Sequence, residues 1–110
     1  MTETYTFKKE GNFLVTEVLG IKFGFRKWTW GEKNALSVQC STIHPITGEV
    51  GFDSIKFNTS LLEKTVYKFD GEFKPMTTDE VNDLDGGLGD RLYQITQKIN
   101  LVQTIETVNL

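Results

Sequence analysis

The stretch Phe25-Arg-Lys-Trp-Thr-Trp-Gly-Glu-Lys-Asn-Ala-Leu36 marks the change from a strand region to a helical region. The residues that lead into this stretch, Ile21–Phe25, alternate apolar residues with polar or small ones, which is the period of a β-strand. Thr29 and Glu32 then have the spacing of a capping box, in which each side chain accepts a hydrogen bond from the other residue's backbone amide. We therefore expect a helix to begin at Trp30.

Two tryptophans flank the N-cap of this helix, Trp28 before it and Trp30 after it. Their large apolar rings favour the core, where they would anchor the joint between strand and helix. The alternative is an exposed aromatic patch, which makes Trp28 and Trp30 the candidate partner-binding residues. The two positions are not equivalent, because Trp28 continues the packing of the strand whereas Trp30 begins the helix and is expected to be the more exposed.

The N-terminal quarter of the chain predicts three strands joined by short turns. Tyr5–Lys9 alternates apolar and polar residues, Phe13–Leu19 is more apolar, and Ile21–Lys27 follows a tight turn at Gly20. Strands in this order form an antiparallel meander, and the apolar face of such a sheet needs helices against it. The edge at Tyr5–Lys9 would be open to a neighbouring chain.

Three or four helices are expected after the meander, each with a capping or periodicity signal. In the first, Leu36, Cys40 and Ile43 have helical spacing, and His44-Pro45 ends the helix, because a proline disfavours helical backbone at the residue before it. The predicted helices are Trp30–Ser41, Ser54–Lys64 with Asp53 as N-cap, Asp79–Leu84 after a capping box from Thr77 to Glu80, and a last helix with the apolar stripe Leu88, Leu92, Ile95 and Ile99.

The remaining segments are short. Pro45–Gly48 predicts a turn, and Glu49–Phe52 and Val66–Phe69 predict short extended pieces. The tail 101–110 has no clear period and is open to three interpretations: a loose arm, a strand, or a continuation of the last helix. We therefore expect an α+β fold, with a single domain over residues 1–100 and a C-terminal tail over 101–110. Its order would be an N-terminal three-stranded antiparallel β meander followed by three or four packed helices.

Length and charge exclude several classes of protein. The chain has 110 residues and a formal net charge of -3, which predicts one domain without general affinity for nucleic acid. No segment has the length and apolarity to cross a membrane, and no apolar signal core is present, so we expect a cytosolic protein. Residues 1–33 hold six Lys or Arg, whereas residues 70–90 hold seven acids. Two faces of opposite charge would suit a homo-oligomer, although ordinary solvated surface also explains the uneven distribution of charge.

The sequence contains no convincing catalytic, cofactor or metal site. Cys40 and His44 are the only cysteine and histidine, which are too few for the usual zinc ligand sets. Asp83-x-Asp85 lacks the other ligands of a calcium loop. Gly86-Gly-x-Gly89 precedes a helix but has no adjacent lysine and several acids nearby, which disfavour phosphate. We therefore expect a protein that is not an enzyme and uses no cofactor.

The order of signals from Phe25 to Asn100 resembles the small tail assembly chaperones of long-tailed bacteriophages. The resemblance covers about three quarters of the chain and continues a short β start that also fits the family. The matching pieces are Arg-Lys-Trp-Thr-Trp-Gly-Glu-Lys-Asn (26–34), Pro-Ile-Thr-Gly-Glu-Val (45–50), Phe-Asn-x-x-Leu-Leu (57–62), Met-Thr-Thr-Asp-Glu-Val-x-x-Leu (76–84), Gly-Asp-x-Leu (89–92) and Ile-Asn (99–100).

The resemblance implies a protein of the bacterial host cytoplasm that binds the tape-measure protein during tail morphogenesis, self-associates and is lost from the finished particle. Its partners would be the tape-measure protein or other phage tail proteins. The alternative is a structural component of a phage tail, baseplate or connector, which would remain in the virion.

Overall fold

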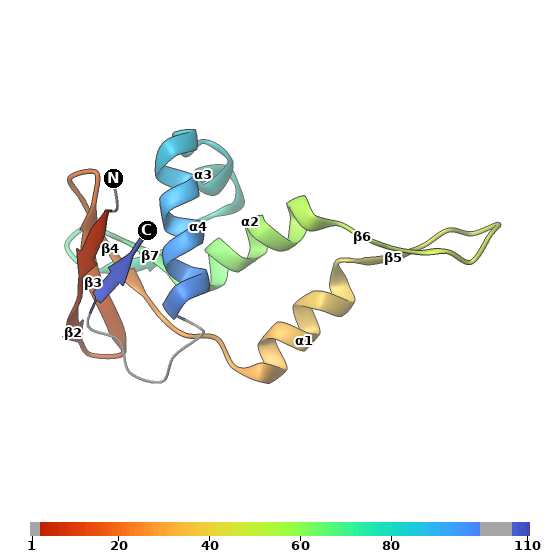
Figure 1. The fold of residues 1–110 in the computed structure, drawn as a ribbon, viewed down its shortest axis with the longest axis horizontal. Helices are drawn as coiled ribbons and strands as arrows, with labels where there is room; N and C mark the ends of the chain where they lie inside the picture. Colours follow the sequence, from red (N-terminus) through yellow and green to blue (C-terminus); the bar gives the residue numbers. More distant parts are fainter. Residues whose placement is uncertain (1–2, 100–106) are drawn as a thin grey trace.

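The computed structural model describes residues 3–99 and 107–110, which form an α+β fold with a five-stranded antiparallel sheet and four helices (Figure 1). The strands are β1 (Thr4–Thr6), β2 (Lys8–Glu10), β3 (Phe13–Val18), β4 (Ile21–Phe25), β5 (Ser41–Ile43), β6 (Val50–Phe52), β7 (Val66–Phe69), β8 (Phe73–Pro75) and β9 (Thr107–Asn109). The helices are α1 (Trp30–Gln39), α2 (Ser54–Thr65), α3 (Thr78–Asn82) and α4 (Gly86–Ile99).

The five-stranded sheet has the order β2-β3-β4-β7-β8, with every neighbouring pair antiparallel. Strands β2, β3 and β4 are consecutive neighbours, as expected of a meander. The predicted order, a three-stranded meander followed by packed helices, is only partly confirmed, because strands β5–β8 are interleaved with the helices. Extended pieces at 49–52 and 66–69 were predicted, but not the sheets that they join. The extended piece at 66–69 is strand β7, which pairs with β4 through Val66 opposite Phe25. The alternation of residues at 66–69 predicts a strand but does not indicate its partner, because β4 lies far away in the sequence.

The first strand region is divided at Phe7, whose ring is buried and makes an edge-to-face contact with Phe25. Before this point β1 leaves the sheet and pairs with β9, with Tyr5 opposite Val108. Part of the edge that was expected to be open is thus covered by the C-terminal end of the same chain. Of the tail 101–110, for which the sequence left three interpretations, residues 107–109 form strand β9, whereas residues 101–106 lie outside the described residues.

Helix α4 supplies most of the helical side of the main core. The four residues of the predicted stripe, Leu88, Leu92, Ile95 and Ile99, are all buried, which confirms that assignment. They belong to one cluster with Phe23, Phe25 and Val66 from the inner face of the sheet. The periodicity alone therefore identified the helix face that closes the core.

Helix α1 does not pack on the sheet, contrary to the expectation that all helices would. It contacts α2, and a separate cluster of Leu36, Cys40 and Leu61 fills the space between the two helices. Helix α1 ends at Gln39, close to the predicted end at Ser41, and Ile43, which has helical spacing with Leu36 and Cys40, lies in strand β5 and is exposed. In Figure 1, α1 accordingly lies well away from the sheet.

The joint between the sheet and α1 is fixed by polar contacts. Thr29 forms the predicted capping box, with Glu32 N–H donating to Thr29 Oγ1 at 3.1 Å and Thr29 N–H donating to Glu32 Oε1 at 3.0 Å. Arg26 adds a bidentate contact to the same carboxylate at 2.7 and 3.1 Å. Hydrogen bonds from Arg26, followed by the one from the Thr29 amide, lower the pKa of Glu32 to about 2.

We predict that Leu92→Ala destabilises the fold by about 2–5 kcal/mol, the usual cost of truncating a fully buried leucine. Leu92 is 0% exposed, so the shortened side chain leaves a cavity between helix and sheet. Chemical denaturation followed by circular dichroism measures the change. Gln94→Ala, at an exposed position of the same helix, is the matched control. Equal stability of the two variants would remove α4 from the core.

A second prediction concerns acid sensitivity. A carboxylate whose pKa falls on folding stabilises the native state above its unfolded pKa, near 4.5 for Glu32, and loses this contribution as the pH falls toward about 2. Glu32→Gln should therefore be less stable than the native chain at neutral pH, and the difference should shrink across that window. Glu17→Gln, at an exposed position on β3, controls for the lost charge. A difference independent of pH would contradict the ion pair.

Candidate functional site

The most distinctive surface of the molecule is a β-hairpin that projects from it, called here the arm and comprising residues 41–52. It contains β5, the turn at 44–49 and β6, and it extends away from the helices (Figure 1). The molecule measures 50 × 32 × 30 Å, with a radius of gyration of 15.2 Å. A compact domain of this length has a radius of roughly 13 Å, so the arm makes the protein markedly elongated.

Both ends of the arm are fixed by backbone hydrogen bonds. At its base, Asp53 N–H donates to the Cys40 carbonyl at 2.7 Å, and near its tip His44 N–H donates to the Glu49 carbonyl at 2.8 Å. Gly48 takes a φ of +72°, as predicted for the turn. The only histidine in the chain therefore lies in an exposed turn. The imidazole Nδ1 accepts hydrogen bonds from the backbone amides of the two residues after Pro45.

The arm has one apolar face and one polar face. Ile43 lies opposite Val50, and on the same face Phe52 lies opposite Ser41. On the other face Thr42 lies so close to Gly51 that a Cβ there would come within 2.6 Å of the threonine Oγ1.

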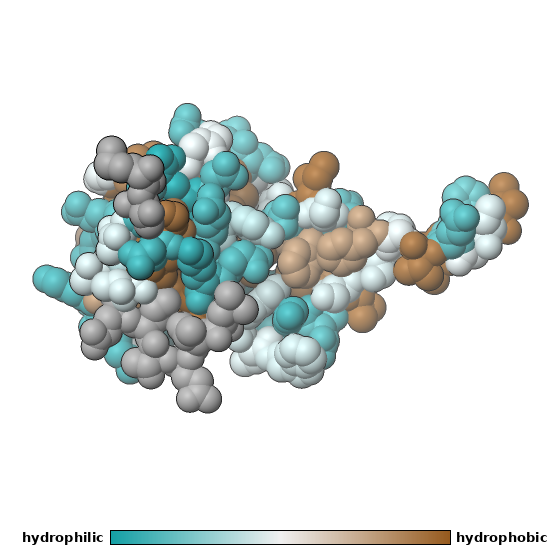
Figure 2. All heavy atoms as spheres, viewed as in Figure 1, coloured by the Kyte–Doolittle hydropathy of each residue, from teal (hydrophilic) through white to brown (hydrophobic). Residues whose placement is uncertain are grey.

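The apolar face is left uncovered. Ile43 is 72% exposed, Val50 75% and Phe52 53%, and Ile46 at the tip is 88% exposed. Figure 2 shows brown, hydrophobic atoms along the arm and at its end. Apolar surface gathered on a projection is typical of a protein-binding site rather than of scattered surface residues.

An aromatic line connects the arm to the small core between α1 and α2. The Phe52 and Phe57 ring centroids are 5.3 Å apart, and those of Phe57 and Trp28 are 5.8 Å apart. Trp28 is partly buried against Leu36 and Leu61. The arm is thus anchored on a packed base, which orients its apolar face.

The two tryptophans have different environments. Trp28 packs against Phe57 and the small core between α1 and α2, whereas Trp30, the first residue of α1, is 72% exposed, with Lys33 Nζ 5.2 Å from the centroid of its ring. The expectation that both would anchor the joint in the core is wrong for Trp30. The candidate pair therefore differs in burial, since the ring of Trp28 packs into the small core and that of Trp30 lies in solvent.

Sequence reasoning missed the arm as a site because it grouped Ile43 with Leu36 and Cys40 by helical spacing and so did not pair it with the extended piece Glu49–Phe52. The pattern Ser-Thr-Ile before Pro45–Gly48 and Val-Gly-Phe after it is nevertheless typical of a hairpin. Helical spacing from Leu36 and Cys40 competed with that pattern.

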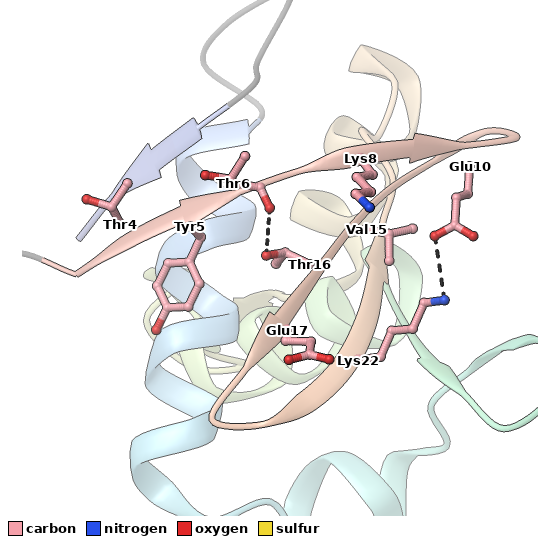
Figure 3. Close-up of a pocket in the computed structure, with 9 residues that line it drawn as sticks. All are labelled: Thr4, Tyr5, Thr6, Lys8, Glu10, Val15, Thr16, Glu17 and Lys22. Carbon is pink, nitrogen blue, oxygen red and sulfur yellow. Dashed lines mark hydrogen bonds and ion pairs between the residues drawn. The ribbon is translucent and has the colours of Figure 1, made fainter.

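A hollow of about 700 Å³ lies beside the diverging strands β1 and β3 (Figure 3). Its charged residues are balanced, and Lys22 pairs with Glu10 at 3.6 Å. Across the splayed strands Thr16 Oγ1 donates to the Thr6 carbonyl at 2.9 Å, as the dashed line shows. These two contacts join residues that line the hollow to one another.

The other residues considered from the sequence have structural positions. Cys40 is buried between α1 and α2. Asp85 Oδ2 accepts hydrogen bonds from the amides of Gly87 and Leu88 and so caps α4. Within residues 3–99 and 107–110, no three acidic, histidine or cysteine side chains are grouped as a metal site would require. Over the same residues, no helix is both long and apolar enough to span a membrane.

No known protein family, no curated protein and no solved structure matches the chain. The function is therefore inferred from the chemistry of the arm and its base.

We predict that the tryptophans differ in quenching by a soluble quencher. In single-tryptophan variants, Trp28→Phe leaves the exposed Trp30 and should be strongly quenched, whereas Trp30→Phe leaves the half-buried Trp28 and should be quenched less. Equal quenching would contradict the arrangement at the base of the arm, and denatured samples of both variants provide the reference.

Proposed function

We propose that the protein is a phage tail assembly chaperone that binds the tape-measure protein during tail morphogenesis. The observation that carries the proposal is the uncovered apolar face of the arm, formed by Ile43, Val50 and Phe52. The resemblance of the segment from Phe25 to Asn100 to the tail assembly chaperones of bacteriophages supports the assignment to a phage. In this proposal the protein acts in the bacterial host cytoplasm and leaves before the particle is complete.

The arm suits an amphipathic helix as its ligand. A two-stranded hairpin with one apolar face can cover one side of a helix, whose anchor residues recur every three or four positions. Tape-measure proteins are long and helical, so many such segments would need cover before the tail assembles around them. Binding of this kind uses no catalytic group and no cofactor.

The second candidate is a structural component of a tail, baseplate or connector, favoured by the reach of the arm. A projection of this length can pack permanently against a neighbouring subunit and become ordered in the particle. In that case the protein would be part of the virion rather than a cytoplasmic helper.

Binding can be tested by co-expressing the chain with the tape-measure protein from the same phage genome. Val50→Asp should weaken the interaction about tenfold or more, because it places a charge in the apolar contact. Val38→Asp is the matched control, since Val38 is also 75% exposed but lies on α1. Equal binding by the two variants, measured by titration, would contradict a contact through the arm.

Protein mass spectrometry of purified particles separates the two candidates. A chaperone should be abundant in producing cells and absent from mature particles. Stoichiometric amounts in the particles would overturn the chaperone proposal and favour the structural one.

A further inference from the structure

Strand β5 exposes a free edge of backbone hydrogen-bonding groups. The backbone of Cys40 is hydrogen-bonded to Asp53 at the base of the hairpin, and the backbone of His44 is hydrogen-bonded to Glu49 near its tip. Because hydrogen-bonded and non-hydrogen-bonded pairs alternate along an antiparallel ladder, Thr42 is bonded to the opposite strand. The N–H and C=O groups of Ser41 and Ile43 therefore point away from β6.

The edges of the five-stranded sheet differ from the arm in charge. On β2 every residue is charged, namely Lys8, Lys9 and Glu10, and β8 contains Lys74 and Pro75. Charges and proline are the usual means by which proteins block pairing at a sheet edge. Strand β5, with the sequence Ser-Thr-Ile, has neither.

We propose that two copies of this chain pair through β5, antiparallel and about a two-fold axis at Thr42. Each Ser41 then lies opposite Ile43 of the second copy and exchanges its outward-pointing backbone hydrogen bonds with it. The two arms form one four-stranded sheet in the order β6-β5-β5-β6. An isolated two-stranded hairpin is marginally stable in water, so this pairing completes an element that is otherwise exposed on both faces.

Charge favours β5 over β6 as the paired edge. An equivalent two-fold pairing of β6 about Gly51 would place Glu49 of each copy opposite Asp53 of the other. Directly opposed like charges destabilise strand pairs, and the symmetry would create this repulsion twice. Pairing about Thr42 instead places Cys40 opposite His44, so no acidic residue of one copy lies opposite an acidic residue of the other. The acidic residues that give each chain its net charge of -3 are therefore not opposed to one another in the pairing through β5.

The paired arms also place both apolar faces on the same side of the new sheet. Directly opposed residues of antiparallel strands share a face, so Ile43, Val50 and Phe52 of both copies line one surface. This surface is twice as wide as that of one arm and gives the proposed helical ligand a larger platform. The pairing itself does not depend on that ligand.

Sedimentation velocity on the full chain alone tests the pairing. From micromolar concentrations to about 1 mM, the range that covers weak self-association, the mass should rise from the 12.5 kDa monomer to twice that value. Thr42→Lys should weaken dimerisation about tenfold or more, because the two-fold axis places the lysines opposite each other. Gln94→Lys, on the exposed face of α4, makes the same charge change away from the arm and should leave dimerisation unchanged.

A monomer at every concentration would overturn the proposal, as would equal association of the two lysine variants. Because no tape-measure protein is present, either result would leave the proposed function standing. A protein that forms the dimer but does not bind the tape-measure protein would overturn the proposed function and leave the pairing through β5 standing.

Disulfide cross-linking gives an independent measurement if the lysine perturbs the arm. Opposed residues at a non-hydrogen-bonded pair have Cβ atoms about 4.5–5.5 Å apart, close enough for a disulfide after small adjustment. Thr42→Cys should therefore form a covalent dimer under mild oxidation. Thr47→Cys, equally accessible in the turn, should do so much more slowly, and the native Cys40 is buried. Equal rates for the two variants would contradict pairing at Thr42.

Discussion

The contact of Arg26 and Thr29 with the carboxylate of Glu32 determines how the rest of the chain is arranged. It fixes the direction in which the chain leaves β4, and that direction carries α1 away from the sheet. The sheet is then covered by helices that come later in the chain, chiefly α4. Because α1 packs chiefly against α2, the connection between these two helices projects into solvent, where it forms the arm.

The apolar face of the five-stranded sheet is covered, whereas the apolar face of the arm is not. The inner face of the five-stranded sheet is closed by the stripe of α4, and the sheet edges carry charges or proline that disfavour pairing. The arm has an uncovered apolar face and an uncharged edge. Exposed apolar surface costs free energy in water, so a surface of this kind is best explained by a partner that covers it.

Several polar groups that the sequence offered as site candidates have structural roles. Asp85 caps a helix, His44 holds a turn, and in the hollow beside β3 Lys22 pairs with Glu10. A binding function needs only shape and apolar area, and both are available on the arm. The proposed chaperone and structural roles therefore differ in how long the contact persists, rather than in the surface that makes it.

Local signals in the sequence determined the elements whose partners are close in the chain. The capping boxes at Thr29 and Thr77 and the stripe on α4 have a short-range physical cause, and each is confirmed. Tertiary structure alone decided where the elements pack: β7 joins β4, and β9 covers β1. It also decided that Ile43 belongs to a strand, because a helical spacing and a hairpin pattern overlap there. Pairing between distant segments depends on the free energy of the whole fold, which no local pattern contains.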